Sequence, residues 1–150
     1  MQTSLRTDGD TPSNRAGLMR RLAAAAYDLL LLIALWMLVS ALFLPLNEGN
    51  APQPGTPLFS AHRLALLATT AAFYIGFWKF GGQTLGMRAW KLELIRDDGL
   101  PMTWLDCVRR LLASLVSILP AGAGFWWLLV DGENRTWHDR LSHTYVRKRT

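Results

Sequence analysis

The chain has few of the residues on which disulfide-stabilised domains and common enzymes depend. It has one cysteine among its 150 residues, Cys107, so it cannot form an intramolecular disulfide. It has no glycine-rich loop ending in Lys-Ser or Lys-Thr, no Gly-x-Ser-x-Gly elbow and no Cys-His pairing. We therefore expect no enzymatic activity and no bound cofactor.

Charged residues are also scarce where the chain is most apolar. Apolar residues make up 51% of the sequence, and they are concentrated in long blocks with most of the Arg and Lys residues between them. This separation is typical of a membrane protein. The formal net charge is +5. Because basic residues flank the apolar blocks, we expect anionic lipid headgroups as partners rather than nucleic acid.

The first apolar block runs from Leu22 to Leu44 and is interrupted only by Asp28 and Ser40. At 1.5 Å per residue, about 23 helical residues cross roughly 30 Å of hydrocarbon, so this block predicts a transmembrane helix. A cleaved signal peptide is the alternative, but its apolar core is only roughly 7 to 15 residues long and does not normally hold an Asp. Arginines precede the block and no Arg or Lys follows until Arg63, which predicts a cytoplasmic N-terminus in the plasma (inner) membrane.

The flanking segments complete a two-helix topology. Residues 1–14 are polar without an apolar period and predict a disordered tail. Residues 45–61, rich in Pro and Gly and free of Lys and Arg, predict an irregular outer loop. Leu64 to Phe80 predicts a second transmembrane helix that returns to the cytoplasm. Amphipathic rings prefer the membrane boundary, and three lie beside the expected boundaries: Trp78, Trp90 and Trp104.

After the second block the pattern changes to a small mixed-charge region. Residues 81–87 contain three glycines and predict an interfacial segment, with a short helix as one form. Lys91 to Arg96 alternate charged and apolar residues, as a strand does, and Asp97-Asp98-Gly99 follows as a turn, which together predict a hairpin.

The third apolar block, Leu111 to Val130, is broken near its centre by Pro120 and two glycines. It either crosses the membrane or forms a re-entrant hairpin. The C-terminal segment is strongly basic, which opposes a third crossing. Thr144 to Arg147 also has strand composition and would pair with Lys91 to Arg96 only from the same side. We favour the re-entrant form, and expect an all-α membrane domain over residues 15–150 with a small two-stranded cytoplasmic β element.

Five short motifs occur in order along the chain: Arg20-Arg21-Leu22-Ala23 followed by Asp28, Gly82-Gln83-Thr84-Leu85-Gly86, Asp97-Asp98-Gly99, Arg109-Arg110-Leu111-Leu112 and Arg135-Thr136-Trp137-His138-Asp139-Arg140-Leu141. From about Ala16 to Arg149 the chain resembles the RDD family of bacterial membrane proteins, named for one arginine and two aspartates. The resemblance implies that these are Arg21, Asp28 and either Asp139 or Asp131. Usual members carry a basic residue after Gly86, where this chain has Met87 followed by Arg88. The family's role is largely undefined, with ion or solute transport suggested, so the resemblance implies a location and candidate residues.

Asp28 is the most informative candidate. It lies seven residues after Arg21, two turns along one helical face and about 10 Å deeper. An ionised Asp at that depth costs roughly 2.5 to 3.5 kcal/mol, so it needs a partner, water or a proton. We expect Arg109, Arg110 or the segment 135–140 as partner, since Arg21 does not easily reach it along one helix. Asp28 is then either a structural ion-pair member or a carboxylate that titrates or binds a cation during transport.

Asp139 lies between His138 and Arg140, and we expect it to cap a helix or to pair with Arg109 or Arg110. His138 and His143 have no third ligand nearby, so we predict no metal site.

Two functions follow from these expectations. The first is a component for ion or small-solute transport that uses Asp28, within a homo-oligomer because so few helices enclose too little space for a pore. The second is a non-transporting scaffold or accessory subunit, whose basic inner face binds anionic lipid or a partner protein.

Overall fold

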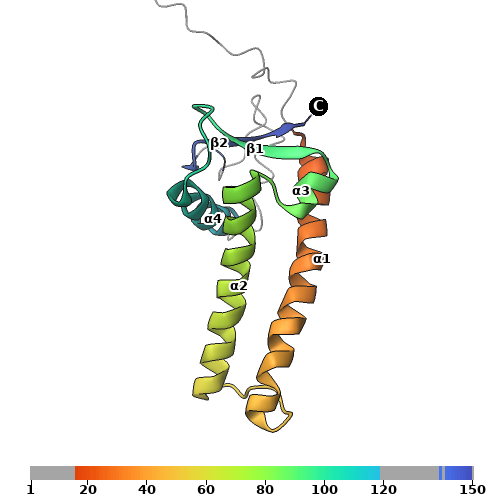
Figure 1. The fold of residues 1–150 in the computed structure, drawn as a ribbon, viewed down its shortest axis with the longest axis vertical. Helices are drawn as coiled ribbons and strands as arrows, with labels where there is room; N and C mark the ends of the chain where they lie inside the picture. The colour runs from red at the N-terminus through yellow and green to blue at the C-terminus, as the bar shows by residue number, and fades with distance from the viewer. Residues whose placement is uncertain (1–15, 119–138, 140, 150) are drawn as a thin grey trace, which may run out of the picture.

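The computed structural model describes residues 16–118, 139 and 141–149. Two long helices lie side by side, and the short helices and strands gather at the end where the first helix begins and the second ends (Figure 1). In chain order the elements are α1 (Leu18–Phe43), η2 (Pro45–Asn47), α2 (Pro57–Gly81), α3 (Leu85–Ala89), β1 (Leu92–Arg96), α4 (Trp104–Ile118) and β2 (Thr144–Lys148).

The two long helices, α1 and α2, are both long and apolar enough to cross a membrane. Only 17% of the most apolar part of α1 and 6% of that of α2 are buried inside the protein. The core helix of a soluble protein would be mostly buried, whereas these two helices leave long apolar faces exposed. The prediction of two helices that are long and apolar enough to span a membrane is confirmed.

Both helices start earlier than predicted, and the reason lies in their N-terminal turns. α1 begins at Leu18 rather than Leu22, and α2 begins at Pro57 rather than Leu64. The Thr56 hydroxyl accepts the N–H of Phe59, and Pro57 occupies the first turn, where its missing N–H costs nothing. The predicted boundaries marked the first continuous apolar residues, whereas the first turns of both helices also contain polar or basic residues.

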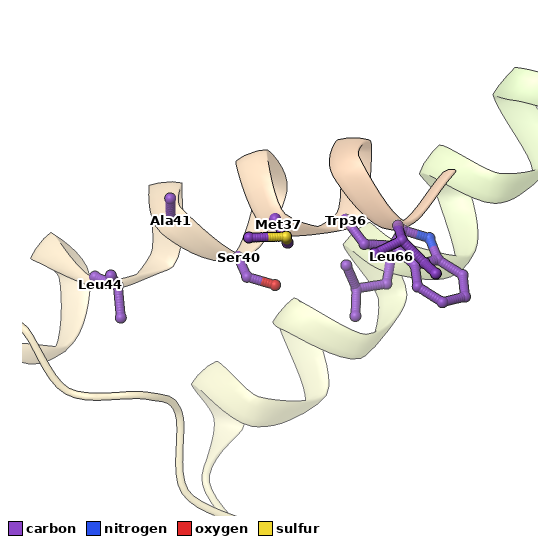
Figure 2. Close-up of a pocket in the computed structure, with 7 residues that line it drawn as sticks. Trp36, Met37, Ser40, Ala41, Leu44 and Leu66 are labelled. Carbon is purple, nitrogen blue, oxygen red and sulfur yellow. The ribbon is translucent and has the colours of Figure 1, made fainter. Parts of the chain in front are cut away.

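Side-chain hydrogen bonds join α1 to α2 towards the η2 end. The Trp36 indole N–H donates to Thr70 Oγ1 at 3.0 Å, and Ser40 Oγ lies 2.9 Å from His62 Nε2. In an apolar environment such groups have few other partners, so these contacts fix the helix pair. Beside them is a shallow, mostly apolar hollow of about 440 Å³ on α1 and Leu66 of α2 (Figure 2).

At the opposite end, β1 and β2 form an antiparallel pair in which Leu92 faces Lys148 and Arg96 faces Thr144. The predicted pairing of these two segments is therefore confirmed. The predicted local hairpin is wrong, because the turn after Arg96 leads into α4 and not into a second strand. The turn itself is present: the Gly99 N–H donates to the Arg96 carbonyl, and Gly99 has φ +72°. A two-stranded ribbon needs an apolar face to pack, and Leu92, Leu94 and Val146 supply it.

α4 lies across the long axis of α1 and α2 (Figure 1). Its inner side carries buried Cys107, Arg110 and Ala113. Its outer side is mostly apolar apart from Arg109, and the exposed residues Leu105, Val108, Leu112 and Leu115 follow one another at helical spacing. The helix begins before the predicted third block and covers its start; residues 119–130, where the choice between crossing and re-entrant forms would be decided, lie outside the described residues.

Candidate functional site

The candidate site begins on one face of α1. Its buried residues are Arg21, Ala24, Asp28 and Leu32, at spacings of three or four, so they form a single stripe. Arg21 is 6% exposed and Asp28 is 3% exposed. The prediction that the two charged residues share a face is confirmed, but each has its own set of partners.

Arg21 belongs to a cluster built around Asp139, whose side chain is fully buried. The Arg21 guanidinium forms an ion pair with Asp139 Oδ2. Arg110 Nη1 lies 2.8 Å from Asp139 Oδ1, so the carboxylate bridges two guanidinium groups. The same Arg110 nitrogen donates to Thr144 Oγ1 at 2.6 Å. We call Arg21, Arg110, Asp139 and Thr144 the Asp139 cluster.

The Asp139 cluster joins segments that are far apart in the sequence. Arg21 Nε donates to the carbonyl of Ala16 at 3.0 Å, and the Ala16 N–H donates to the carbonyl of Val146 on β2. Ser142 Oγ lies 2.7 Å from Thr144 Oγ1, which adds a neutral partner at the start of β2. The start of α1, the inner face of α4 and β2 therefore meet at one buried carboxylate.

In the Asp139 cluster two guanidinium groups share one carboxylate. Burial lowers the pKa of Arg110, while the neighbouring Asp139 carboxylate raises it. The Arg110 guanidinium also lies over the Trp78 ring, 5.4 Å from its centroid, where the negative face of the indole attracts a cation. Trp78, which we predicted beside a membrane boundary, is buried, 6% exposed, and packs under this arginine.

Asp28 has a separate site, one formed by neutral donors. Its Oδ2 accepts the Thr84 hydroxyl at 2.5 Å, and its Oδ1 accepts the Gly86 N–H at 2.7 Å. The Thr84 hydroxyl also caps α3 by accepting the Met87 N–H. The predicted partners Arg109 and Arg110 are therefore wrong: Arg110 lies on Asp139, and Arg109 is exposed on α4.

The backbone of α3 approaches α1 so closely that only glycine fits at Gly86. A Cβ at this position would lie 2.1 Å from the Ala24 carbonyl oxygen and 2.9 Å from Asp28 Cγ. Gly82 ends α2 with φ +62°, a left-handed conformation that glycine adopts without strain. The motif from Gly82 to Gly86 thus ends α2, reverses the chain, caps α3 and places two donors on Asp28.

The structure brings together four of the predicted residues, in two sites along α1: Arg21, Asp28, Arg110 and Asp139. The predicted pairing of Asp139 with Arg110 is confirmed, and Asp139 is the aspartate that contacts Arg21. Asp131 and His138 lie outside the described residues. Sequence reasoning missed Thr84, Gly86 and Thr144; the glycine motif and the capping Thr at position 84 are the signals that pointed to the first two.

No group of three His, Cys, Asp or Glu residues that would hold a metal ion occurs in residues 16–118, 139 and 141–149. The two sites present instead a bridged carboxylate and a hydrogen-bonded carboxylate. Both arrangements connect structural elements: Asp139 contacts Arg21 of α1 and Arg110 of α4, and Asp28 of α1 accepts from Thr84 and Gly86 at the start of α3.

Comparison with known proteins gives one match. The model of the RDD family matches residues 15–143, a range that includes Arg21, Asp28, Arg110 and Asp139. No curated protein and no solved structure matches the chain. Together with the two apolar helices, this match indicates a membrane protein, and because it covers most of the sequence, the chain belongs to the RDD family.

Proposed function

We propose that this protein is a non-enzymatic scaffold or accessory subunit of the plasma membrane, in which Arg21, Asp28 and Asp139 hold the domain together. Its partners would be anionic lipid on the inner face and a second copy or another membrane protein. The observation that carries the proposal is that the carboxylates of both aspartates already have hydrogen-bond or ion-pair partners within the protein. Asp139 is bridged by two arginines, and Asp28 accepts two hydrogen bonds from Thr84 and Gly86.

A fully partnered buried carboxylate is poorly suited to exchange an ion. To bind a cation, Asp28 would have to release the Thr84 hydroxyl and the Gly86 N–H, and each buried donor left without an acceptor costs about 1–3 kcal/mol. Breaking a buried ion pair costs about 3–5 kcal/mol, which applies to Asp139. A structural role uses these contacts as they stand.

The proposed topology has a cytoplasmic N-terminus and both strands on the cytoplasmic side. β1 follows α2 after the short helix α3 and pairs with β2, so the chain between the two strands would enter the membrane and return to the same side. The outward leucines of α4 would then lie in the inner leaflet, with the helix axis along the interface, as in amphipathic interfacial helices.

Single engineered cysteines at Asn50 and Thr150, in a Cys107→Ser background, test this topology. A membrane-impermeant maleimide is applied to intact cells. We expect labelling at position 50 and none at 150 until the cells are permeabilised. Labelling at both positions in intact cells would mean an odd number of crossings after β1 and would contradict the proposal.

The functional role is tested by separating assembly from flux. Asp28→Asn and Asp139→Asn are compared with wild type for abundance in the membrane, for complex size in mild detergent, and for cation flux in proteoliposomes. A scaffold predicts loss of abundance or complex size, with no wild-type flux above empty vesicles. Wild-type flux that Asp28→Asn abolishes at unchanged abundance would refute the scaffold.

That last result would support the second candidate, a component for ion or small-solute transport. The observation in its favour is the position of Asp28: a carboxylate two turns beyond Arg21 in a helix that is apolar enough to span the membrane. A path would then need several copies of the chain, because α1 and α2 alone do not surround a pore.

A further inference from the structure

A groove lies between the end of α2 and α3, and the structural roles of Asp28 and the Asp139 cluster do not account for it. Its volume is about 410 Å³, within the range of roughly 300–1,000 Å³ found for small-molecule sites. Ala72, Gly76, Phe77 and Phe80 of α2 line its apolar part. Gln83 and Arg88 line the part towards α3. The groove therefore combines apolar side chains with one basic group.

Arg88 is the charged group of this groove. It is exposed on α3, and its guanidinium has no ion-pair partner among the residues that the structure describes. No Asp or Glu lines the groove. An anion would thus meet one free positive charge and the Gln83 amide, with no acidic side chain in the groove wall.

Small residues keep the apolar part open. A Cβ added at Gly76 would meet nothing within 4 Å, and Ala72 is exposed. Phe77 and Phe80 form apolar walls beside them. This shape suits a flexible hydrocarbon chain, which gains van der Waals contacts with the flat faces of the rings and can lie along the helix surface.

We propose that the groove binds one anionic phospholipid of the bilayer, with its phosphate at Arg88 and Gln83 and one acyl chain along Gly76 and Phe77. The proposal rests on the membrane location in the proposed function, and not on the role of the Asp139 cluster. Charge complementarity selects the lipid: a free arginine next to an apolar channel matches a negative headgroup joined to a hydrocarbon tail. A helix from a second copy would fill the apolar part but would leave Arg88 unused.

The test is a lipid titration of the full-length protein in detergent, followed by native mass spectrometry. The probes are phosphatidylglycerol and phosphatidylcholine with identical acyl chains. We expect wild type to retain one phosphatidylglycerol per chain and to prefer it over phosphatidylcholine by about fivefold, the factor that one interfacial arginine supplies.

Two variants separate the headgroup from the tail. Arg88→Gln should remove the preference, lowering phosphatidylglycerol affinity about fivefold with phosphatidylcholine unchanged. Gly76→Leu fills the apolar part and should lower the affinity for both lipids by about tenfold or more, since a tail loses the burial of a few methylene groups. If Gly76→Leu does not fold, Ala72→Leu replaces it.

Matched controls are Arg109→Gln, an exposed arginine outside the groove, and Ala68→Leu, an exposed alanine one turn earlier on α2. Both controls should bind phosphatidylglycerol and phosphatidylcholine with wild-type affinity. The proposal is overturned if both groove variants retain wild-type affinity, if wild type shows no preference between the lipids, or if Gly76→Leu changes oligomer size while lipid binding is unaffected. None of these variants touches Asp28 or the Asp139 cluster, so failure here leaves the scaffold proposal standing.

Discussion

The guanidinium of Arg21 forms a buried ion pair with the carboxylate of Asp139, a residue 118 positions later in the chain. The pair joins the start of the first long helix to the segment just before β2. Arg110 reaches the same carboxylate from α4, so a single side chain connects three parts of the fold. The first and last described segments of the domain are therefore held at one end of the α1 and α2 pair.

Removing this carboxylate should be strongly destabilising. Asp139→Asn removes the carboxylate that bridges the buried guanidinium groups of Arg21 and Arg110, and we expect the free energy of unfolding to fall by about 3–5 kcal/mol. Circular dichroism during chemical unfolding in detergent measures the change. Asp98→Asn is the control, because the Arg96–Asp98 pair is at the surface and its loss should leave stability almost unchanged. Equal stability of Asp139→Asn and wild type would disprove the role assigned to the cluster.

Gly86→Ala should disturb the contact of α3 with α1. The added methyl group would overlap the Ala24 carbonyl, so α3 must move away, and we expect a loss of about 1–3 kcal/mol. Gly76→Ala is the matched control: it lies inside α2 with open space around it, and should stabilise by about 0.5–1 kcal/mol. The comparison uses thermal unfolding of both variants in one detergent, and a Gly86→Ala protein as stable as Gly76→Ala would rule out the close approach.

Thr84→Val tests the hydroxyl that serves both Asp28 and the cap of α3. Valine keeps the shape but removes the donor to Asp28 and the acceptor for Met87, and we expect a loss of about 1–3 kcal/mol. Thr84→Ser retains the hydroxyl, so its free energy of unfolding should fall much less. Hydrogen exchange of the amides of α3 reports the local effect. If serine and valine give equal exchange rates, the hydroxyl does not hold α3.

Cys107 should be unreactive in the folded protein. It is fully buried on the inner side of α4, and burial, with the nearby Asp106 carboxylate, raises the pKa of its thiol. Both effects lower the amount of accessible thiolate at neutral pH. We expect no mass increase with a permeant maleimide until SDS is added. Ala89→Cys, at an exposed position, serves as the positive control; labelling of Cys107 at the rate of that control would mean that α4 does not pack as described.

Local pattern was sufficient for much of the fold. The apolar blocks predicted α1 and α2, and alternation together with composition predicted that Lys91 to Arg96 pairs with Thr144 to Arg147. The partner of Asp28 could not be predicted in this way. A search for opposite charge leads to Arg109 or Arg110, whereas the groups that hold Asp28 are a hydroxyl and a backbone N–H. A pattern of charged residues does not reveal neutral hydrogen-bond donors, and the position of these two donors depends on where α3 packs.

By itself the sequence determined that two helices are apolar over the length of a bilayer, that basic residues collect at one end, and that Arg21 and Asp28 share a face. These properties follow from composition and from the 3.6-residue period, which are local. Only the tertiary structure decided which charges meet. Asp139 is bridged by Arg21 and Arg110 because α1, α4 and β2 converge, and convergence depends on packing between segments far apart in the chain. The pairing of buried charges is a property of that packing, since a charge excluded from water is stable only where a distant segment supplies its partner.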